Sequence, residues 1–310
     1  MPWLDNARIL ELTDVPEHLV ILGGSYIALE FGQIFRRFGA QVTIIERGSQ
    51  LVFREDADVA VAITEILELE GIDVVLDASA VSGAPEREGV ALTIEQAGEQ
   101  RRVIGSHLFV AVGRTPNSDG LKADTAGIEL DDRGFIVVDD YCRTTADGVF
   151  PVGDINGHGA FIHTSVNDAE IVLDQMRGGS RKLSDRFPVY DLFIDPALGR
   201  VGMTEKEAVA KGLNVLTATR RMSQIGRAKE MGETLGFAKL LVDADADTDL
   251  ILGAAILGPG GDEIVNMLAA FMYSGLPCRR YPKSVLVHPT ISELMPWILD
   301  SLKPVESSVG

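Results

Sequence analysis

The sequence predicts an α/β protein of more than one domain, on three observations. Between His18 and Asn117, short apolar runs typical of buried strands alternate with segments of helical periodicity. From Phe187 onward, a second series of strand-like segments and amphipathic helices follows. The chain has 310 residues, and at roughly 150 residues per domain this length allows about two domains.

The composition is that of an ordinary globular protein, with 46% hydrophobic and 24% charged residues. The net charge of −18 would repel nucleic-acid phosphates and anionic lipids, so we expect neither nucleic acid nor a membrane as a partner. The N-terminal segment MPWLDNARIL lacks the features of a signal peptide, and no window is apolar enough to span a bilayer. These features predict a cytoplasmic protein.

Two cysteines, Cys142 and Cys278, lie far apart in the sequence. They do not have the spacing of a metal knuckle or a redox pair. We therefore expect two free thiols and no metal site.

The segment from His18 to Glu46 predicts a strand, a glycine turn, a helix and a second strand. The apolar run LVIL is typical of a parallel strand buried on both faces, and it ends at Gly23 and Gly24, where the backbone must turn. Apolar residues then recur at helical spacing from Tyr26 until Arg36, Arg37 and Gly39 close the pattern, and VTIIE predicts the second strand.

Such a unit can bind a dinucleotide, because the start of the helix offers unpaired amides and a partial positive charge to a pyrophosphate. Against the pattern G-x-G-x-x-G or A, this chain has Gly23, Ser25 and Ala28. Serine adds a side chain at the position of closest approach. A glycine turn between strand and helix can also serve packing alone.

Glu46 follows Gly23 by 23 residues, at the end of the second strand. A carboxylate there can accept both hydroxyls of an adenosine ribose, and the alternative is a solvated acid at a strand end. The carboxylate would repel a 2′-phosphate, which favours NAD over NADP. Arg47 beside it could accommodate that phosphate.

The remainder of this domain continues the alternation. Residues 55–71 predict an amphipathic helix, IDVVL a third strand, the segments around 89–104 a hairpin, and SHLFVAVGRTPN a buried strand that ends at Gly113. Later, VFPVGD predicts an apolar strand that ends at a polar turn, where Asp154 could cap the next helix.

The part of the chain after Phe187 predicts an α+β domain. The predicted strands are FPVYDLFI, VLTATRRM, ETLGFAKLLVDAD and LILGAAILG, and the predicted helices are TEKEAVAKG and GDEIVNMLAAFMYSG. By themselves, alternating strands and apolar helices do not distinguish one α+β domain from another.

The motifs GGSYIALEFG, VTIIE, AVGRTPN, DGVFPVGD and HPTISE, in this order, resemble the class I pyridine nucleotide-disulfide oxidoreductases, the family of dihydrolipoamide dehydrogenase, glutathione reductase and mercuric reductase. The resemblance runs from about Pro16 to about Leu302 and looks strongest to mercuric-reductase-like members. It implies a Rossmann-like NAD(P)-binding domain at 1–120, the C-terminal part of a second Rossmann-like, FAD-binding domain at 121–186, and an α+β dimerisation domain at 187–310. A homodimer is also implied.

The resemblance also implies which residues bind the cofactors. Tyr26 and Glu30 match residues that flank the nicotinamide pocket in relatives. On periodicity alone, both could equally be ordinary helix residues. Asp154 would bind the ribityl chain of FAD, and Phe161, Ile162 and His163, at the start of the predicted helix in AFIHTSVNDAEIVLDQM, would lie near the flavin ring. The cofactor-binding residues expected on this basis are Gly23, Gly24, Ser25, Tyr26, Glu30, Glu46, Arg47, Gly113, Gly153, Asp154, Phe161 and Ile162.

His288 and Glu293 match the pair that, in relatives, reaches across the dimer to the redox centre of the partner subunit. A glutamate can hold an imidazole in one tautomer and raise its basicity, which proton transfer near a thiol requires. Alternatively, Thr290 and Glu293 have the spacing of a capping box at a helix start.

The sequence departs from the family pattern in three places. It shows neither a preceding glycine-rich unit for the FAD pyrophosphate nor a C-x-x-x-x-C disulfide, and its last residues, SLKPVESSVG, contain no cysteine pair of the kind that captures mercury. Mercury reduction is therefore not expected. We expect a strand edge and an apolar face of the FAD-domain segment to be uncovered.

The function implied by the resemblance is that of an FAD-dependent NAD(P)H oxidoreductase, with NAD preferred. Hydride would pass from nicotinamide to flavin and then to a disulfide or another acceptor. Two alternatives remain open: a catalytically silent nucleotide-binding and dimerising module, and a flavin-independent NAD dehydrogenase that uses His288 as a base.

Overall fold

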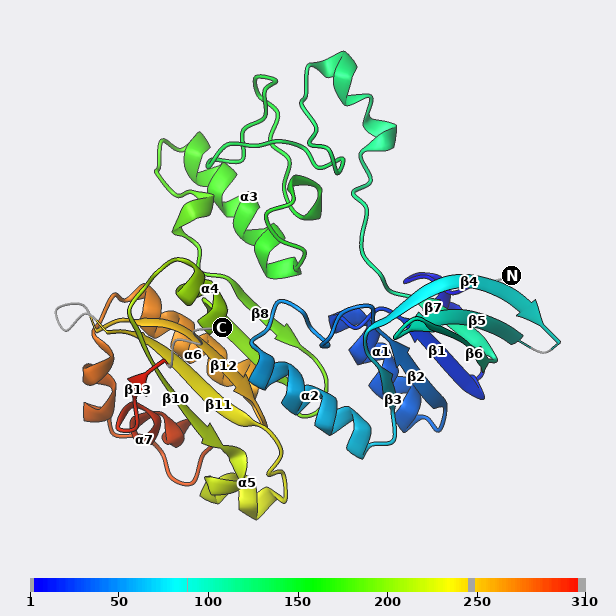
Figure 1. Ribbon diagram of the computed structural model, residues 1–310. Coiled ribbons are helices and arrows are strands. Elements are labelled where there is room, and N and C mark those ends of the chain that lie inside the picture. The colour runs from blue at the N-terminus through cyan, green and yellow to red at the C-terminus, as the bar shows by residue number, and fades with distance from the viewer. Residues whose placement is uncertain (1–2, 88, 245–248, 306–310) are drawn as a thin grey trace. The chain divides into compact units, whose positions relative to one another are not determined.

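The computed structural model describes residues 3–87, 89–244 and 249–305. It divides the chain into two compact units. The first unit contains Met1–Val112 together with Pro188–Gly310, and the second contains Gly113–Phe187. The two parts of the first unit lie side by side in Figure 1.

A four-stranded parallel sheet forms the N-terminal part of the first unit, in the order β3-β2-β1-β7. Its elements are β1 (His18–Leu22), α1 (Tyr26–Arg37), β2 (Gln41–Ile45), α2 (Ala57–Leu69), β3 (Asp73–Val75) and β7 (His107–Val110). The predicted strand, turn, helix and second strand are confirmed. The central strand β1 is buried along Leu19–Ile21, as the apolar run LVIL requires.

A three-stranded antiparallel sheet is inserted before β7, formed by β4 (Ala78–Glu86), β5 (Gly89–Gln96) and β6 (Glu99–Gly105). The sequence predicted only the hairpin of β5 and β6. The strand β4 escaped prediction because its sequence, ASAVSGAPE, contains serine, glycine and proline, and most of it is exposed.

The C-terminal part of the first unit is an antiparallel sheet of six strands in the order β13-β10-β11-β12-β9-β8. Its strands are β8 (Val189–Leu192), β9 (Leu198–Gly202), β10 (Val215–Arg221), β11 (Phe237–Asp243), β12 (Ile251–Leu257) and β13 (Lys303–Pro304). Its helices are α4 (Glu205–Ala210), α5 (Gly226–Met231), α6 (Gly261–Tyr273) and α7 (Met295–Leu299). Helix α6 packs on β9 and β12. Strands β9 and β13 and helix α5 were not predicted from the sequence.

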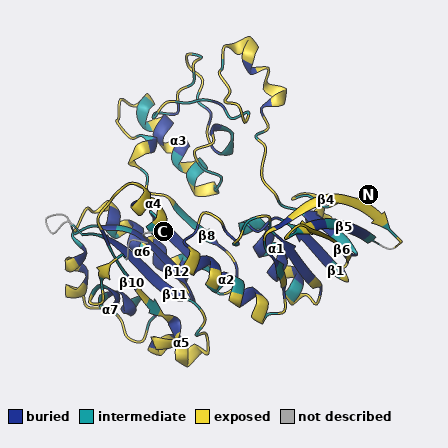
Figure 2. Cartoon of the chain, in the orientation of Figure 1, coloured by how far each residue is buried: buried dark blue, intermediate teal, exposed yellow. Residues whose placement is uncertain are grey.

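The two parts of the first unit share one hydrophobic core. Leu192, Leu198 and Leu257 from the C-terminal sheet belong to the same buried cluster as Leu29 of α1 and Val59 of α2. Figure 2 shows the central strands of both sheets in the buried colour. Because apolar burial is continuous across the junction, the parallel sheet and the C-terminal sheet form one packed body.

The second unit consists mainly of loops around one long helix, α3 (Ile162–Met176). Its 3₁₀ helices are Asp119–Leu121, Ala123–Ala126, Asp154–Asn156 and Leu183–Asp185. The helix was predicted correctly, but the strand predicted at VFPVGD was wrong. Within the described residues of this unit, only the isolated bridge of Leu130 with Ile136 has β pairing, and a strand without a partner cannot satisfy its backbone groups.

One face of α3 is apolar and exposed. Ile162, Val166, Leu173 and Met176 are all at least half exposed along it. The small core of this unit is built instead on Cys142, Ile171, Val172 and Leu183. The expectation that this segment leaves an apolar face uncovered is confirmed.

Both cysteines are buried, and neither forms a disulfide. Among the residues that the structure describes, no helix has the length and apolar character needed to cross a bilayer.

Candidate functional site

The turn after β1 is shaped by two glycines. Gly23 has φ +113°, and a Cβ on it would lie 2.5 Å from the carbonyl oxygen of Ala111. A Cβ on Gly24 would lie 2.8 Å from Cδ2 of Leu51. Both contacts are too close for a side chain, so this turn requires glycine. It brings the backbone next to β7 on one side and to the loop after β2 on the other.

Helix α1 begins directly after this turn. Ser25 is its N-cap residue, with extended backbone and no side-chain cap hydrogen bond in the described structure. The first turn of α1 contains no acidic residue. The first amides of a helix lack intrahelical partners, so this end of α1 can accept an anionic group.

The Glu46 carboxylate lies against the turn. The Gly24 amide donates to its Oε2 at 2.7 Å, and the Gly48 amide donates to its Oε1 at 2.7 Å. Glu46 is half-buried, whereas Arg47 beside it is exposed. The carboxylate is therefore held in place by two backbone amides rather than simply solvated, and each oxygen keeps a lone pair for a further donor.

The loop that follows Glu46 returns to the same turn. The Val52 amide donates to the Gly24 carbonyl at 2.8 Å, and Leu51 is fully buried. Val52 has φ +44°, an unfavourable conformation for a β-branched residue that costs on the order of 1–3 kcal/mol. Such a conformation persists only where the surroundings hold it, so this loop is firmly packed.

Tyr26 and Glu30 lie on the first turns of α1, both partly buried. The Glu30 Oε1 accepts a hydrogen bond of 2.9 Å from the amide of Phe193. Burial raises the pKa of Glu30, and the Phe193 amide partly opposes that shift. This contact supplies the partner that a buried carboxylate at this position requires.

In the second unit, Gly153 and Asp154 form a turn against α3. Gly153 has φ +80°, and a Cβ on it would lie 2.8 Å from the Ser165 hydroxyl. Asp154 pairs with Arg114 at 2.9 Å, and both side chains are largely exposed. Asp154 does not cap a helix: the N-cap of the short helix is Gly153, and that of α3 is Phe161. The capping interpretation was therefore wrong.

Asp168 holds this turn and was missed by the sequence analysis. It is 1% exposed and accepts hydrogen bonds from the Gly153 amide at 2.8 Å, from Asn156 at 2.7 Å and from Arg186 at 2.7 Å. The sequence offered one signal for this role: Asp168 lies on the same face of the amphipathic helix as the apolar Ile171 and Val172. A carboxylate buried on such a face needs hydrogen-bond partners.

The start of α3 carries the three expected flavin neighbours. The rings of Phe161 and His163 stack with centroids 5.3 Å apart, and Ile162 is 85% exposed. Since Ser165 of α3 contacts Gly153, the Asp154 turn and the start of α3 lie together. No strand–glycine–helix unit that could hold a dinucleotide pyrophosphate occurs in the described residues of the second unit. Gly113 lies exposed at the boundary of this unit.

His288 and Glu293 form a pair in the structure. Nδ1 of His288 lies 2.9 Å from Oε2 and 3.1 Å from Oε1 of Glu293. The Glu293 side chain is 10% exposed and that of His288 77%. Thr290 accepts from the Glu293 amide at 3.3 Å, which is half of a capping box, but the carboxylate contacts His288. With Nδ1 engaged, Nε2 is the nitrogen available for proton exchange.

Comparison with known families identifies the family of the chain. The family model described as pyridine nucleotide-disulphide oxidoreductase matches residues 2–169, and that of the dimerisation domain of the same family matches residues 190–299. The chain belongs to the pyridine nucleotide-disulphide oxidoreductases. The family resemblance and the α/β fold class predicted from the sequence are confirmed.

Among curated relatives, the probable pyridine nucleotide-disulfide oxidoreductase RclA of Escherichia coli is 37% identical over 93% of this chain and 65% of its own length. Dihydrolipoyl dehydrogenase of Geobacillus stearothermophilus is 32% identical over 94% of this chain and 62% of its own length. The chain thus spans a little under two thirds of these relatives.

A solved structure of the Cu(II) complex of the HOCl-induced flavoprotein disulfide reductase RclA from E. coli superposes with a TM-score of 0.89 at 35% identity. It covers 97% of this chain, and the match spans 68% of the RclA chain. LpdA of Mycobacterium tuberculosis has a TM-score of 0.88 at 23% identity and shares the fold.

Proposed function

We propose that this chain is the NAD(P)-binding and dimerising part of an FAD-dependent NAD(P)H oxidoreductase, divided at residues 1–120, 121–186 and 187–310. The observation that carries the proposal is the Glu46 carboxylate, which backbone amides hold against Gly24 where α1 begins. The amides at the start of α1 would bind the pyrophosphate, and Glu46 would accept the hydroxyls of the adenosine ribose. Gly23, Gly24 and Ser25 would line the same site.

NAD is the proposed preference over NADP. The Glu46 carboxylate would lie close to the 2′ position of a ribose bound by its hydroxyls, and two negative charges at that distance repel each other. Arg47, next to Glu46, would favour a 2′-phosphate, but its side chain is exposed. Tyr26 and Glu30 would lie at the nicotinamide end of the nucleotide.

FAD is proposed as the second cofactor because RclA is described as a flavoprotein disulfide reductase. A bound flavin takes up hydride from a reduced nicotinamide and passes electrons on to a disulfide or another acceptor. In this chain, Asp154 would orient the ribityl chain, and Gly153, Phe161 and Ile162 would lie near the flavin. Gly113 would begin the segment that leads to this site.

His288 and Glu293 are proposed as the proton-transferring pair, acting across a homodimer. Glu293 would hold Nδ1 of the imidazole, as its contact at 2.9 Å supports. The largely exposed imidazole would then be accessible to a redox centre of the partner subunit.

Size-exclusion chromatography followed by absorbance spectra of the protein fractions tests the proposal. The purified chain is run with and without added FAD, and NADH binding is measured on the same fractions. Flavin that co-elutes with the protein supports the flavoenzyme proposal. A colourless protein that binds NADH indicates a silent nucleotide-binding module. NADH oxidation with a substrate and no flavin indicates the flavin-independent dehydrogenase, and absence of NADH binding overturns the proposal.

A further inference from the structure

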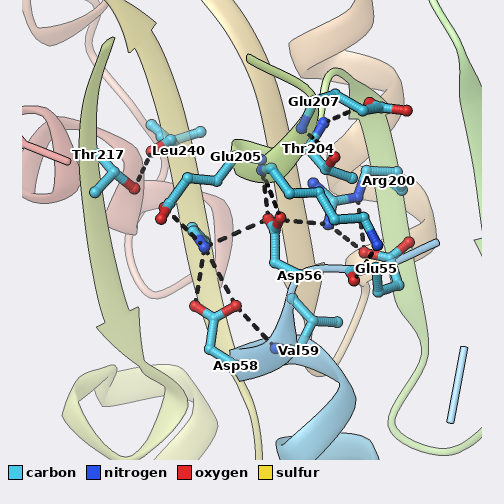
Figure 3. A network of polar contacts seen from close by, with 12 residues as sticks. Glu55, Asp56, Asp58, Val59, Arg200, Thr204, Glu205, Glu207, Thr217 and Leu240 are labelled. Atoms are coloured by element: carbon cyan, nitrogen blue, oxygen red, sulfur yellow. Dashed lines mark hydrogen bonds and ion pairs between the residues drawn. The ribbon is translucent and has the colours of Figure 1, made fainter. Parts of the chain in front are cut away.

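A buried network of charged side chains connects the loop after β2 with the C-terminal sheet. We refer to residues 46–56 as the ribose loop, because Glu46 is its first residue. Figure 3 shows Glu55 and Asp56, at the end of this loop, beside Arg200 of β9. Glu55 and Arg200 are each 2% exposed, and Asp56 is 6% exposed.

Arg200 pairs directly with Glu55. Its Nε donates to Oε2 of Glu55 at 3.0 Å, and Nη2 contacts the same oxygen. The Tyr190 hydroxyl of β8 donates to the other Glu55 oxygen. Burial lowers and the Glu55 carboxylate raises the pKa of Arg200, and the net shift is upward, so the guanidinium stays charged. Removing either partner would leave the other buried without its principal ion pair.

Residues of the C-terminal part also bind Phe53 and Asp56, the neighbours of Glu55 in the loop. Lys206 donates through Nζ to the carbonyl oxygens of Phe53 at 2.5 Å and Glu55 at 2.8 Å. The amides of Glu205 and Lys206 donate to the Asp56 carboxylate, each at 3.1 Å. Lys239 of β11 contacts Asp56 at 3.4 Å.

The ribose loop is therefore held at both ends. At its start, Glu46 accepts from Gly24, and Val52 donates to Gly24. At its other end, Glu55 and Asp56 are bound to the C-terminal sheet. Because both ends of the loop are anchored, we expect a change at Glu55 to alter the position of the Glu46 carboxylate.

We propose that Arg200 is a positioning residue for dinucleotide binding: its ion pair with Glu55 fixes the ribose loop so that Glu46 faces the adenosine ribose. The inference rests on the proposed function of Glu46 as the ribose ligand. It assigns to the C-terminal sheet a role in nucleotide affinity, in addition to dimerisation. Arginine suits this role better than lysine, because its planar guanidinium offers several fixed donors.

A second ion pair between the two parts of the first unit serves as the control. Arg37 of α1 pairs with Asp195 of the C-terminal part at 2.7 Å, with side-chain exposures of 46% and 65%. This pair also crosses the junction, but it lies at the far end of α1 from the glycine turn and makes no contact with the ribose loop in the described structure.

The test is the affinity of the full chain for NADH and for ADP-ribose, measured by calorimetry. R200M/E55Q removes both charges and keeps an acceptor for Tyr190. R37M/D195N makes the equivalent change in the control ion pair. We expect R200M/E55Q to weaken both ligands about tenfold, the change that ~1.4 kcal/mol of binding represents. R37M/D195N should leave both within about twofold.

A second comparison separates positioning from general destabilisation. If Arg200 acts through Glu46, E46A/R200M/E55Q should bind ADP-ribose no more weakly than E46A alone, whereas independent effects would add. R200K, which keeps the charge, should fold even if R200M/E55Q does not, and should lose about threefold in affinity because it lacks the guanidinium fork.

Unchanged ADP-ribose affinity in folded R200M/E55Q overturns the inference, as does full additivity with E46A. If R200M/E55Q does not fold, unchanged affinity in R200K overturns it. If E46A itself leaves the affinity unchanged, the ribose assignment under the proposed function has failed. If E46A weakens binding and R200M/E55Q does not, only the role of Arg200 has failed.

Discussion

At the scale of single residues, close contacts explain why particular side chains are found where they are. Gly23 and Gly24 have no room for a Cβ, and Glu46 uses two backbone amides to hold its carboxylate. Each of these contacts joins segments of one local unit. The spacing of Gly23 and Glu46 along the sequence pointed to Glu46 as a ribose ligand, and the structure adds that its carboxylate is bound by the Gly24 amide.

Replacement of Glu46 by alanine should weaken NADH binding by about tenfold or more. Hydrogen bonds from a neutral donor to a charged acceptor contribute about 1.5–3 kcal/mol, and E46A removes the carboxylate that would accept from the ribose. Calorimetric titration with NADH measures this change. E65A, at an exposed position on α2, is the control, and equal affinities of the two variants would show that Glu46 is not the ribose ligand.

We expect the stability of the protein to depend on pH through Asp191. Its pKa is raised to about 6, first by burial and then by the nearby charges of Asp262 and Glu263, and one of its oxygens is buried without a hydrogen-bond partner in the described structure. Because the folded-state pKa is raised, the stabilising contribution is present at low pH and is lost as the pH rises through about 6.

The variant D191N should therefore raise the melting temperature at pH 7.5 and have little effect near pH 4. Asp191 is only half-buried, so we expect the gain to be about 1 kcal/mol after allowance for solvent screening. Thermal unfolding at both pH values measures it. D300N, at an exposed position, should change neither melt, and a gain of D191N that is equal at both pH values would contradict the explanation.

At the scale of elements, strand β9 was not predicted because its residues serve neighbouring elements. Strand β9, LGRVG, is fully buried but contains two glycines and an arginine. A Cβ on Gly199 would lie 2.2 Å from the carbonyl oxygen of Gly261, so glycine here permits the close approach of α6. Arg200 is tolerated in the core because Glu55 pairs with it. Neither reason is visible in the local sequence.

In the second unit, the turn at Gly153 depends on α3 through Asp168. We expect D168N to destabilise this unit by about 3 kcal/mol, since removal of one partner of a buried ion pair costs roughly 3–5 kcal/mol and Arg186 keeps some solvent contact. Limited proteolysis should show faster cleavage within residues 113–187.

The matched control is E170Q, on the same helix, because Glu170 and Arg181 form an exposed ion pair with side-chain exposures of 50% and 52%. Exposed pairs contribute about 0–1 kcal/mol, so cleavage should be unchanged. Equal cleavage rates for D168N and E170Q would show that Asp168 does not hold the turn.

At the scale of the whole molecule, the parallel sheet and the C-terminal sheet share one core and a buried charge network. The second unit has only a small core and an exposed apolar face on α3. The chain spans 65% of RclA and 62% of a dihydrolipoyl dehydrogenase.

The whole chain should be a dimer in solution. The dimerisation-domain model matches residues 190–299, and the proposed role of His288 requires a second subunit. Sedimentation equilibrium over a range of concentrations measures the mass. H288A should remain dimeric, and a wild-type chain that is monomeric at all concentrations would exclude the proposed action of His288 across subunits.

The sequence by itself determined the βαβ unit and the positions of α1, α3 and α6, because hydrophobic periodicity and glycine turns act over short stretches of chain. The family followed from the resemblance of several motifs in order. The same resemblance implied the pair of His288 and Glu293, whose side chains lie in contact. Only the tertiary structure decided that Glu55 meets Arg200, 145 residues further along the chain. That contact depends on how two sheets pack on a common core, and this packing has no local signature in the sequence.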